Sequence, residues 1–239
     1  MNIDKSKIKG IIFDYGGTLD TGGRHWSEVL WDGYRQAGVE VDRAEFREAY
    51  VYAERELART LHILPAHDFH DMLDIKVRIE LEWLVQQGLF SPDEVEAKGK
   101  DIAQICYDFA RKTVHASEPV LQALSEKYPL VLVSNFYGNI ETVLEDFGIR
   151  KYFKDITESA VLGIRKPDPR IFEYGVKSLG ILPEQTLVIG DSLRKDIEPA
   201  ESLGCQVLWI KGEGWTKEED EQTHPNTIYA LEEAKAILL

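Results

Sequence analysis

Three aspartates and one lysine of this 239-residue chain lie where side chains commonly do chemistry. Asp14 ends an apolar run and precedes a pair of glycines, Asp191 and Asp196 follow a second apolar run that ends in glycine, and Lys166 precedes Pro167. A carboxylate at the end of a buried strand can act as a nucleophile or as a metal ligand. One lysine and a divalent cation can make such an acidic cluster attractive to an anionic substrate.

These residues follow segments whose composition predicts buried strands. Short runs of Ile, Leu, Val and Phe bounded by glycine or polar residues are typical of a parallel sheet. Such runs occur over residues 8–13, 130–133, 155–159, 186–190 and 207–210. Helices are predicted over residues 119–127, 168–179 and 194–203, in a segment that ends at Phe147, and after Ile228. The alternation predicts right-handed crossovers with helices on both faces, and ligands bind beyond the carboxyl ends of such strands.

A helical segment interrupts this pattern directly after the first strand. Apolar spacing, composition and helix-start signals predict helices over about 26–37, 43–61 and 68–87, and from Ser91 to about Thr113. No strand pattern occurs between residues 24 and 113. The sequence therefore predicts an all-α insertion in an α/β chain, with Gly22 and Gly23 as hinge candidates.

The composition limits the partners and the compartment. The chain has 42 acidic and 28 basic residues, a formal net charge of −14 and a pI near 4.9. This balance argues against nucleic acid or an anionic membrane as a partner, because each requires a basic face. Cys106 and Cys205 lack metal-ligand spacing, which is typical of buried free thiols. No segment approaches the roughly 20 apolar residues of a membrane span, so we expect a soluble cytoplasmic protein.

Four segments together resemble, in the same order, the motifs of the haloacid dehalogenase (HAD) superfamily. Asp14–Leu19 (D-Y-G-G-T-L) is similar to the first motif and Val133–Asn135 to the second. Gly163–Phe172, which contains Lys166, is similar to the third, and Ile189–Asp196 (I-G-D-S-L-R-K-D) to the fourth. The resemblance implies a Rossmann-like core of residues 1–22 and 114–239. It also implies an inserted helical cap of the C1 type over residues 23–113, which would close over the catalytic crevice and exclude water.

The superfamily consists mostly of Mg²⁺-dependent phosphatases, and the resemblance implies a role for each matched residue. Asp14 would be the nucleophile, Lys166 would place a positive charge beside it, and Asp196 would orient Lys166 or a metal-bound water. A Mg²⁺ ion between Asp14 and Asp191 would offset their repulsion and bridge to the phosphate. The implied phosphate-binding residues are Gly17, Thr18, Ser134, Asn135 and Lys166, and the implied Mg²⁺ ligands are Asp14, the backbone carbonyl of Gly16, Asp191 and Asp196.

Gly16 departs from the family pattern, because phosphatases usually have a second aspartate there. The backbone carbonyl of that residue binds Mg²⁺, which glycine can also do, whereas the carboxyl group protonates the leaving alkoxide and later activates water. Such proton transfer is worth roughly 10²–10⁴-fold in rate. Candidate replacements for the missing acid are Asp20 on the same loop, which is slightly favoured, His25, and a cap histidine among His62, His67 and His70. A substrate with a good leaving group, such as an anomeric or acyl phosphate, would need the acid less.

We therefore expect a hydrolase that cleaves a small phosphorylated metabolite through an aspartyl-phosphate on Asp14. One alternative is a weakly active or non-catalytic protein that binds phosphate and Mg²⁺, which Gly16 alone supports. Another is a dehalogenase-like hydrolase, although family dehalogenases work without Mg²⁺ and lack the later pair of aspartates. Family phosphonate hydrolases form a Schiff base on an early cap lysine. No lysine occurs between Asp14 and Lys76, which argues against that chemistry.

Overall fold

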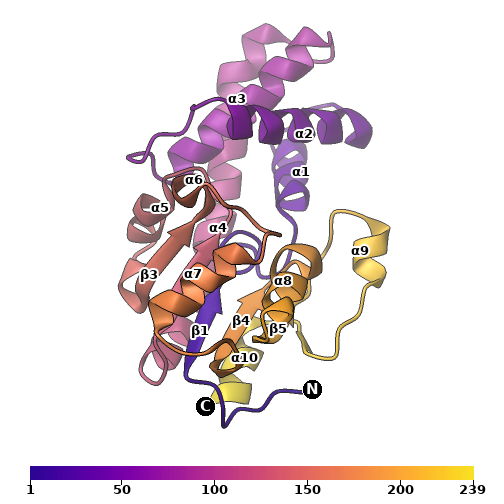
Figure 1. Ribbon diagram of the computed structural model, residues 1–239. Helices are drawn as coiled ribbons and strands as arrows, with labels where there is room; N and C mark the ends of the chain where they lie inside the picture. The colour runs from indigo at the N-terminus through magenta and orange to yellow at the C-terminus, as the bar shows by residue number, and fades with distance from the viewer.

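The computed structural model describes all residues, 1–239, and contains one parallel six-stranded sheet with helices on both faces (Figure 1). The strand order is β3-β2-β1-β4-β5-β6, and every neighbouring pair is parallel. The strands are β1 (Gly10–Phe13), β2 (Leu130–Ser134), β3 (Phe153–Glu158), β4 (Thr186–Gly190), β5 (Gln206–Ile210) and β6 (Thr227–Ile228). The fold is therefore the Rossmann-like α/β fold that the sequence predicts.

Alternate residues of the central strands point to opposite faces of the sheet, and each face has its own layer of helices. On one face, Phe13 and Leu132 pack in an apolar cluster with α4 (Val95–Ser125), α5 (Ile140–Asp146) and α10 (Leu231–Leu238). On the other face, Ile12 and Val133 pack with α7 (Arg170–Leu179) and α8 (Glu198–Ser202). Burial on both faces explains why the strands are almost continuously apolar.

A helical region lies beyond the carboxyl ends of the strands, at the top of Figure 1. It consists of α1 (Trp26–Gln36), α2 (Arg43–Arg59), α3 (Phe69–Gln86) and the first half of α4. Asp42 and Asp68 begin α2 and α3 with complete capping boxes, and such a cap typically stabilises a helix by about 1 kcal/mol. Phe46 of α2 and Leu73 of α3 belong to the same apolar cluster as the sheet residues beside α4.

The helix that leaves this region is longer than the sequence predicts. The sequence pattern indicates one helix that ends near Thr113 and another over residues 119–127, but the structure has a single helix, α4, with Pro119 inside it. Proline removes one backbone hydrogen bond, although its fixed φ suits a helix. Val114 before the proline and Leu121 after it are both buried in the same apolar cluster, and this burial outweighs the lost bond. The boundary predicted between residues 113 and 114 falls inside α4, and the division into core and cap stays a prediction.

The remaining elements are short and have weak sequence signals. α6 (Ser159–Leu162), α9 (Lys217–Glu221) and the edge strand β6 are not predicted from the sequence. Residues Leu193–Ile197 form a π-helical turn before α8, where the sequence predicts one α-helix. Three 3₁₀ turns complete the chain, at Pro92–Glu94, Arg150–Tyr152 and Pro183–Gln185. None of the helices combines the length and the apolar character needed to span a bilayer.

Candidate active site

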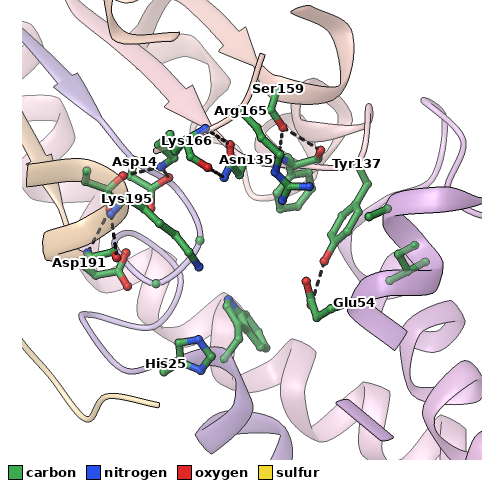
Figure 2. A pocket seen from close by; sticks show the side chains of 18 of the residues that line it. Asp14, His25, Glu54, Asn135, Tyr137, Ser159, Arg165, Lys166, Asp191 and Lys195 are labelled. Atoms are coloured by element: carbon green, nitrogen blue, oxygen red, sulfur yellow. Dashed lines mark hydrogen bonds and ion pairs between the residues drawn. The ribbon is translucent and has the colours of Figure 1, made fainter. Parts of the chain in front are cut away.

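A cavity of about 840 Å³ lies between the carboxyl edge of the sheet and the helical region. Asp14 after β1, Asn135 after β2, Lys166 between β3 and β4, and Asp191 after β4 all line it. Figure 2 shows these side chains on one side of the cavity and residues of the helical region facing them from the other. The volume is in the range of metabolite-binding sites. The strand ends that the sequence singles out therefore meet at one cavity.

Lys166 joins two of the three aspartates. Its Nζ lies 2.5 Å from Asp14 Oδ1 and 2.6 Å from Asp196 Oδ1, and all three side chains are buried. Burial alone would lower the pKa of Lys166, but the charges and hydrogen bonds of Asp14 and Asp196 outweigh it and raise that pKa above its usual value. Lys166 is therefore an ammonium ion. Because desolvation makes a buried ion pair a weak source of stability, its place in the cavity wall points to chemistry rather than to folding.

The three carboxylates form a cluster that fits a divalent cation. Asp14, Asp191 and Asp196 each offer an oxygen, and these oxygens lie within 4.8 Å of one another. Burial, together with the charges of Asp14 and Asp196, raises the pKa of Asp191 well above its usual value. A divalent cation would relieve this repulsion, and hard oxygen ligands suit Mg²⁺. The Gly16 carbonyl oxygen accepts no backbone hydrogen bond, so it is free to complete the ligand set that the sequence predicts.

The two glycines of the loop after β1 have opposite surroundings. Gly17 has a φ of +97°, and a Cβ there would lie 2.4 Å from Asp191 Oδ2. Gly16 lies outside the left-handed region and lines the cavity, and a Cβ there would meet nothing within 4 Å. Gly17 is therefore required for the close approach of the loop to Asp191. The position where phosphatases usually have the second aspartate, in contrast, has room for a side chain.

Gly17→Ala is expected to lower the free energy of unfolding by roughly 1–3 kcal/mol, because alanine at that φ is strained and its methyl group overlaps Asp191. Gly16→Ala is the matched control, and its stability should be unchanged or higher by up to about 1 kcal/mol. Urea denaturation of both variants measures the difference. Equal stability of the two would show that the loop relaxes and that Asp191 does not restrict position 17.

Asp20 lies behind this loop and not in the cavity wall. Its Oδ1 accepts the Gly17 N–H at 2.7 Å, and its Oδ2 accepts the Trp26 indole N–H at 3.0 Å. Burial raises the pKa of Asp20 to about 7, although the two hydrogen bonds oppose this shift. Both carboxyl oxygens thus hold protein donors, and this geometry favours a positioning role for Asp20. Its role as the replacement acid stays a prediction, as does phosphate binding by Gly17, whose N–H is already engaged.

Thr18 and Asn135 position the charged groups. Thr18 is fully buried, and its Oγ1 lies 3.3 Å from Asp14 Oδ2 and 3.2 Å from Asp191 Oδ1. The Asn135 amide donates to the Lys166 carbonyl at 3.0 Å and accepts the Lys166 N–H at 2.8 Å. These contacts hold the two carboxylates and the lysine in place. Direct contact of either residue with phosphate stays a prediction.

Ser134 is not among the residues that line the cavity. It ends β2, its exposure is only 1%, and its hydroxyl has no hydrogen-bond partner. Buried hydroxyls are almost always hydrogen-bonded, so an unpaired one requires an explanation. A phosphoryl oxygen that accepts this O–H would supply it, and phosphate binding by Ser134 stays a prediction.

Only two of the candidate histidines line the cavity, and His62 stays a candidate acid. His25 and His62 line the cavity, whereas His67 and His70 do not. Burial, assisted by nearby lysines, lowers the pKa of His25 to about 4. The imidazole of His25 is therefore neutral near pH 7 and is a poor proton donor.

A polar group on the helical side of the cavity faces the aspartates, and the sequence analysis places neither of its two charged members in the site. It consists of Glu54 on α2, Lys76 on α3 and Tyr137 after β2, all of which line the cavity. Lys76 pairs with Glu54 and lies over the Tyr50 ring, 4.4 Å from its centroid. A signal was available, because Lys76 falls with Leu73 on the apolar face of its helix, where a lysine needs a partner.

Lys76 is also the first lysine after Asp14 in the chain, and it lines the cavity, where a Schiff-base lysine would have to lie. Burial would lower its pKa, but Glu54 and neighbouring tyrosines raise it well above its usual value. A protonated lysine is not a nucleophile. This charge state agrees with the sequence argument against phosphonate-hydrolase chemistry.

Comparison with known proteins identifies the family. Residues 8–204 match the haloacid dehalogenase-like hydrolases. The chain belongs to this family. The matched range contains all four motif segments and the helical region of this HAD-like hydrolase.

Among the curated relatives of this HAD-like hydrolase are one named as a phosphatase and one named as a nucleotidase. The glyceraldehyde 3-phosphate phosphatase of Methanocaldococcus jannaschii is 36% identical over 86 residues, which cover 36% of this chain and 38% of the relative. The pyrimidine 5′-nucleotidase PynA of Streptococcus pneumoniae is 33% identical over 128 residues, which cover 51% of this chain and 54% of the relative. The chain thus spans about half or less of the length of these relatives.

The solved structures show the same fold. A dehalogenase described in an intermediate complex superimposes with a TM-score of 0.64 at 17% identity, over 97% of each chain. At this identity, the likeness establishes the fold that the two proteins share and not a common reaction.

Proposed function

We propose that this HAD-like hydrolase is a Mg²⁺-dependent phosphatase that cleaves a small phosphorylated metabolite through an aspartyl-phosphate on Asp14. The observation that carries this proposal is the pairing of Lys166 with Asp14 and Asp196, with Asp191 in the same carboxylate cluster. A relative named as a phosphatase and another named as a nucleotidase, which also cleaves a phosphate ester, support the same reaction class. Cleavage of a carbon–halogen bond would not require an acidic cluster able to hold a divalent cation.

The proposed reaction has two steps. A carboxylate oxygen of Asp14 forms a bond to phosphorus while the bond between phosphorus and the leaving oxygen breaks, and the leaving alkoxide takes up a proton. A water molecule then attacks the phosphorus of the aspartyl-phosphate, which releases inorganic phosphate and a proton and restores Asp14. Lys166 and the Ser134 hydroxyl stabilise charge on the transferred phosphoryl group.

Other residues hold these groups in place. Mg²⁺ bound by Asp14, Asp191, Asp196 and the Gly16 carbonyl would supply positive charge beside the phosphate dianion. The Ser192 N–H donates to Asp196 Oδ2 at 3.0 Å, which leaves Oδ1 for Lys166. The Trp209 indole donates to the Asp191 carbonyl at 2.6 Å and fixes the end of β4.

Phosphate release from a panel of phosphorylated metabolites is expected to require Mg²⁺ and to return when Mg²⁺ is added back after chelation. Asp191→Ala should lower kcat/KM by about 10²-fold or more, because it removes one proposed ligand. Asp93→Ala, an exposed aspartate outside the cavity, is the control and should match the wild type.

Two results would redirect the assignment. Undiminished turnover in excess chelator, together with halide release from 2-haloacids, would indicate a dehalogenase-like enzyme. Binding of Mg²⁺ and inorganic phosphate without turnover of any substrate would indicate a non-catalytic protein.

A further inference from the structure

The polar group on the cap side of the cavity leaves one carboxylate oxygen unused. Glu54 Oε1 accepts hydrogen bonds from Lys76 Nζ and, at 3.2 Å, from the Tyr137 hydroxyl. No protein donor contacts Glu54 Oε2, and the Glu54 side chain is 36% exposed whereas that of Lys76 is 5% exposed. Figure 2 shows Glu54 and Tyr137 facing the cavity opposite the aspartates. One side of this ion pair is thus open to whatever occupies the cavity.

Glu54 is a charged hydrogen-bond acceptor near neutral pH. Burial would raise its pKa, but the charge of Lys76 and the hydrogen bonds from Lys76 and Tyr137 outweigh burial and lower it. A carboxylate accepts hydrogen bonds and cannot donate them. Its free oxygen therefore selects for a ligand that carries O–H or N–H donors, and it disfavours a second phosphate or carboxylate at that point.

The charges around Glu54 favour hydroxyl donors over an ammonium group. Lys76 already neutralises the carboxylate, and the charge of Lys195 also acts on it. A ligand cation at Glu54 would meet both lysines, which would cancel most of the gain from the carboxylate. Neutral hydroxyl groups are not repelled in this way. The ring of Trp26, which also lines the cavity, offers a flat surface for the carbon skeleton of such a ligand.

We infer that Glu54 is a specificity-determining residue that accepts hydrogen bonds from hydroxyl groups of the leaving group. The substrates are then phosphorylated sugars or polyols, with the phosphate at Asp14 and the hydroxyl groups at the cap wall. This inference rests on the proposed phosphatase function for the position of the phosphate. A purely structural role, in which Glu54 only neutralises Lys76, predicts no difference in affinity between ligands with and without hydroxyl groups.

Ligand binding tests this inference without requiring turnover. Isothermal titration calorimetry with the Asp14→Asn protein and Mg²⁺ compares glucose 6-phosphate, glycerol 3-phosphate, phosphoethanolamine and ethyl phosphate. Both hydroxylated ligands should bind about tenfold or more tightly than ethyl phosphate, since hydrogen bonds to a charged group contribute about 1.5–3 kcal/mol. Phosphoethanolamine should bind no more tightly than ethyl phosphate.

Substitutions then assign the preference to Glu54. Glu54→Asp keeps the charge beside Lys76 but withdraws the free oxygen from the cavity, and it should reduce the preference to within about twofold. Glu48→Asp is the matched control on the same helix, exposed and outside the cavity, and it should keep the full preference. Thermal melts confirm that both variants are folded. If Glu54→Asp unfolds, the double variant Glu54→Leu/Lys76→Met replaces it, because it removes the ion pair as a whole, and the same loss is expected.

Three results would overturn the inference. With Glu54 intact in the Asp14→Asn protein, these are tighter binding of phosphoethanolamine than of the hydroxylated ligands, or no preference for the hydroxylated ligands over ethyl phosphate. The third is a folded Glu54→Asp protein that keeps the preference. Mg²⁺-dependent phosphate release from acetyl phosphate, measured separately with the wild type, tests the phosphatase function itself. The two ideas can therefore fail independently.

Discussion

Asp14→Asn is expected to abolish phosphate release, with a loss of roughly 10⁴-fold or more in kcat, while the fold remains intact. The amide of asparagine is a poor nucleophile and a weaker Mg²⁺ ligand than a carboxylate. The asparagine side chain has nearly the same shape as the aspartate that it replaces, so the packing around the loop should persist. Steady-state phosphate release with and without Mg²⁺ measures the effect, and thermal melting monitors the fold.

Asp93→Asn is the control for this substitution, because it makes the same chemical change at an exposed site and should leave kcat unchanged. Turnover by Asp14→Asn at the wild-type rate would end the covalent mechanism. Loss of activity together with loss of the folded state would instead assign Asp14 a structural role through its contact with Lys166.

Gly16→Asp is expected to increase kcat by roughly 10²–10⁴-fold for substrates with poor leaving groups, because it supplies a general acid–base group. The structure leaves room for the change, since a Cβ at Gly16 meets no atom within 4 Å and the backbone is outside the left-handed region. Lys166 and the carboxylate cluster already line the cavity. Activated substrates such as acetyl phosphate should gain little, because their leaving groups need no proton in the transition state.

Gly16→Asn is the matched control for the gain, because it has the same size but cannot transfer a proton. An increase in both variants would indicate a steric effect on the loop and not acid–base catalysis. Unchanged or lower turnover in a well-folded Gly16→Asp protein would mean that another acid, such as Asp20, is already active. Gly16 would then be an adaptation that makes room for the substrate.

Much of the fold could be predicted because local patterns and tertiary packing agree. The apolar runs that end at Asp14 and Asp191 have no polar face. They must therefore be buried on both faces, as the strands of a parallel sheet are. The sequence pattern failed at Pro119, where the local signal for a helix break is overridden by burial of α4 along both halves. It also missed β6, whose two residues are held by pairing with β5 and carry no periodicity.

The catalytic side of the site could be predicted more completely than the cap side. Asp14, Lys166 and Asp191 follow strands, so the topology brings them to one edge. Glu54 and Lys76 lie on two different helices, and their pairing depends on how those helices pack, which no local pattern specifies. The contacts of Asp20 were hidden for the same reason, because they depend on the fold of the loop between Gly17 and Trp26.

The most direct test of the central claim is detection of a phosphoryl group on Asp14. Wild-type protein is mixed with Mg²⁺ and acetyl phosphate, quenched in acid during the first turnovers, digested, and analysed by mass spectrometry. The mechanism predicts that the peptide that contains Asp14 gains the mass of one phosphoryl group, and that the same peptide of Asp14→Asn does not. Rapid phosphate release with an unmodified Asp14 peptide, or a phosphoryl group on another residue, would contradict it.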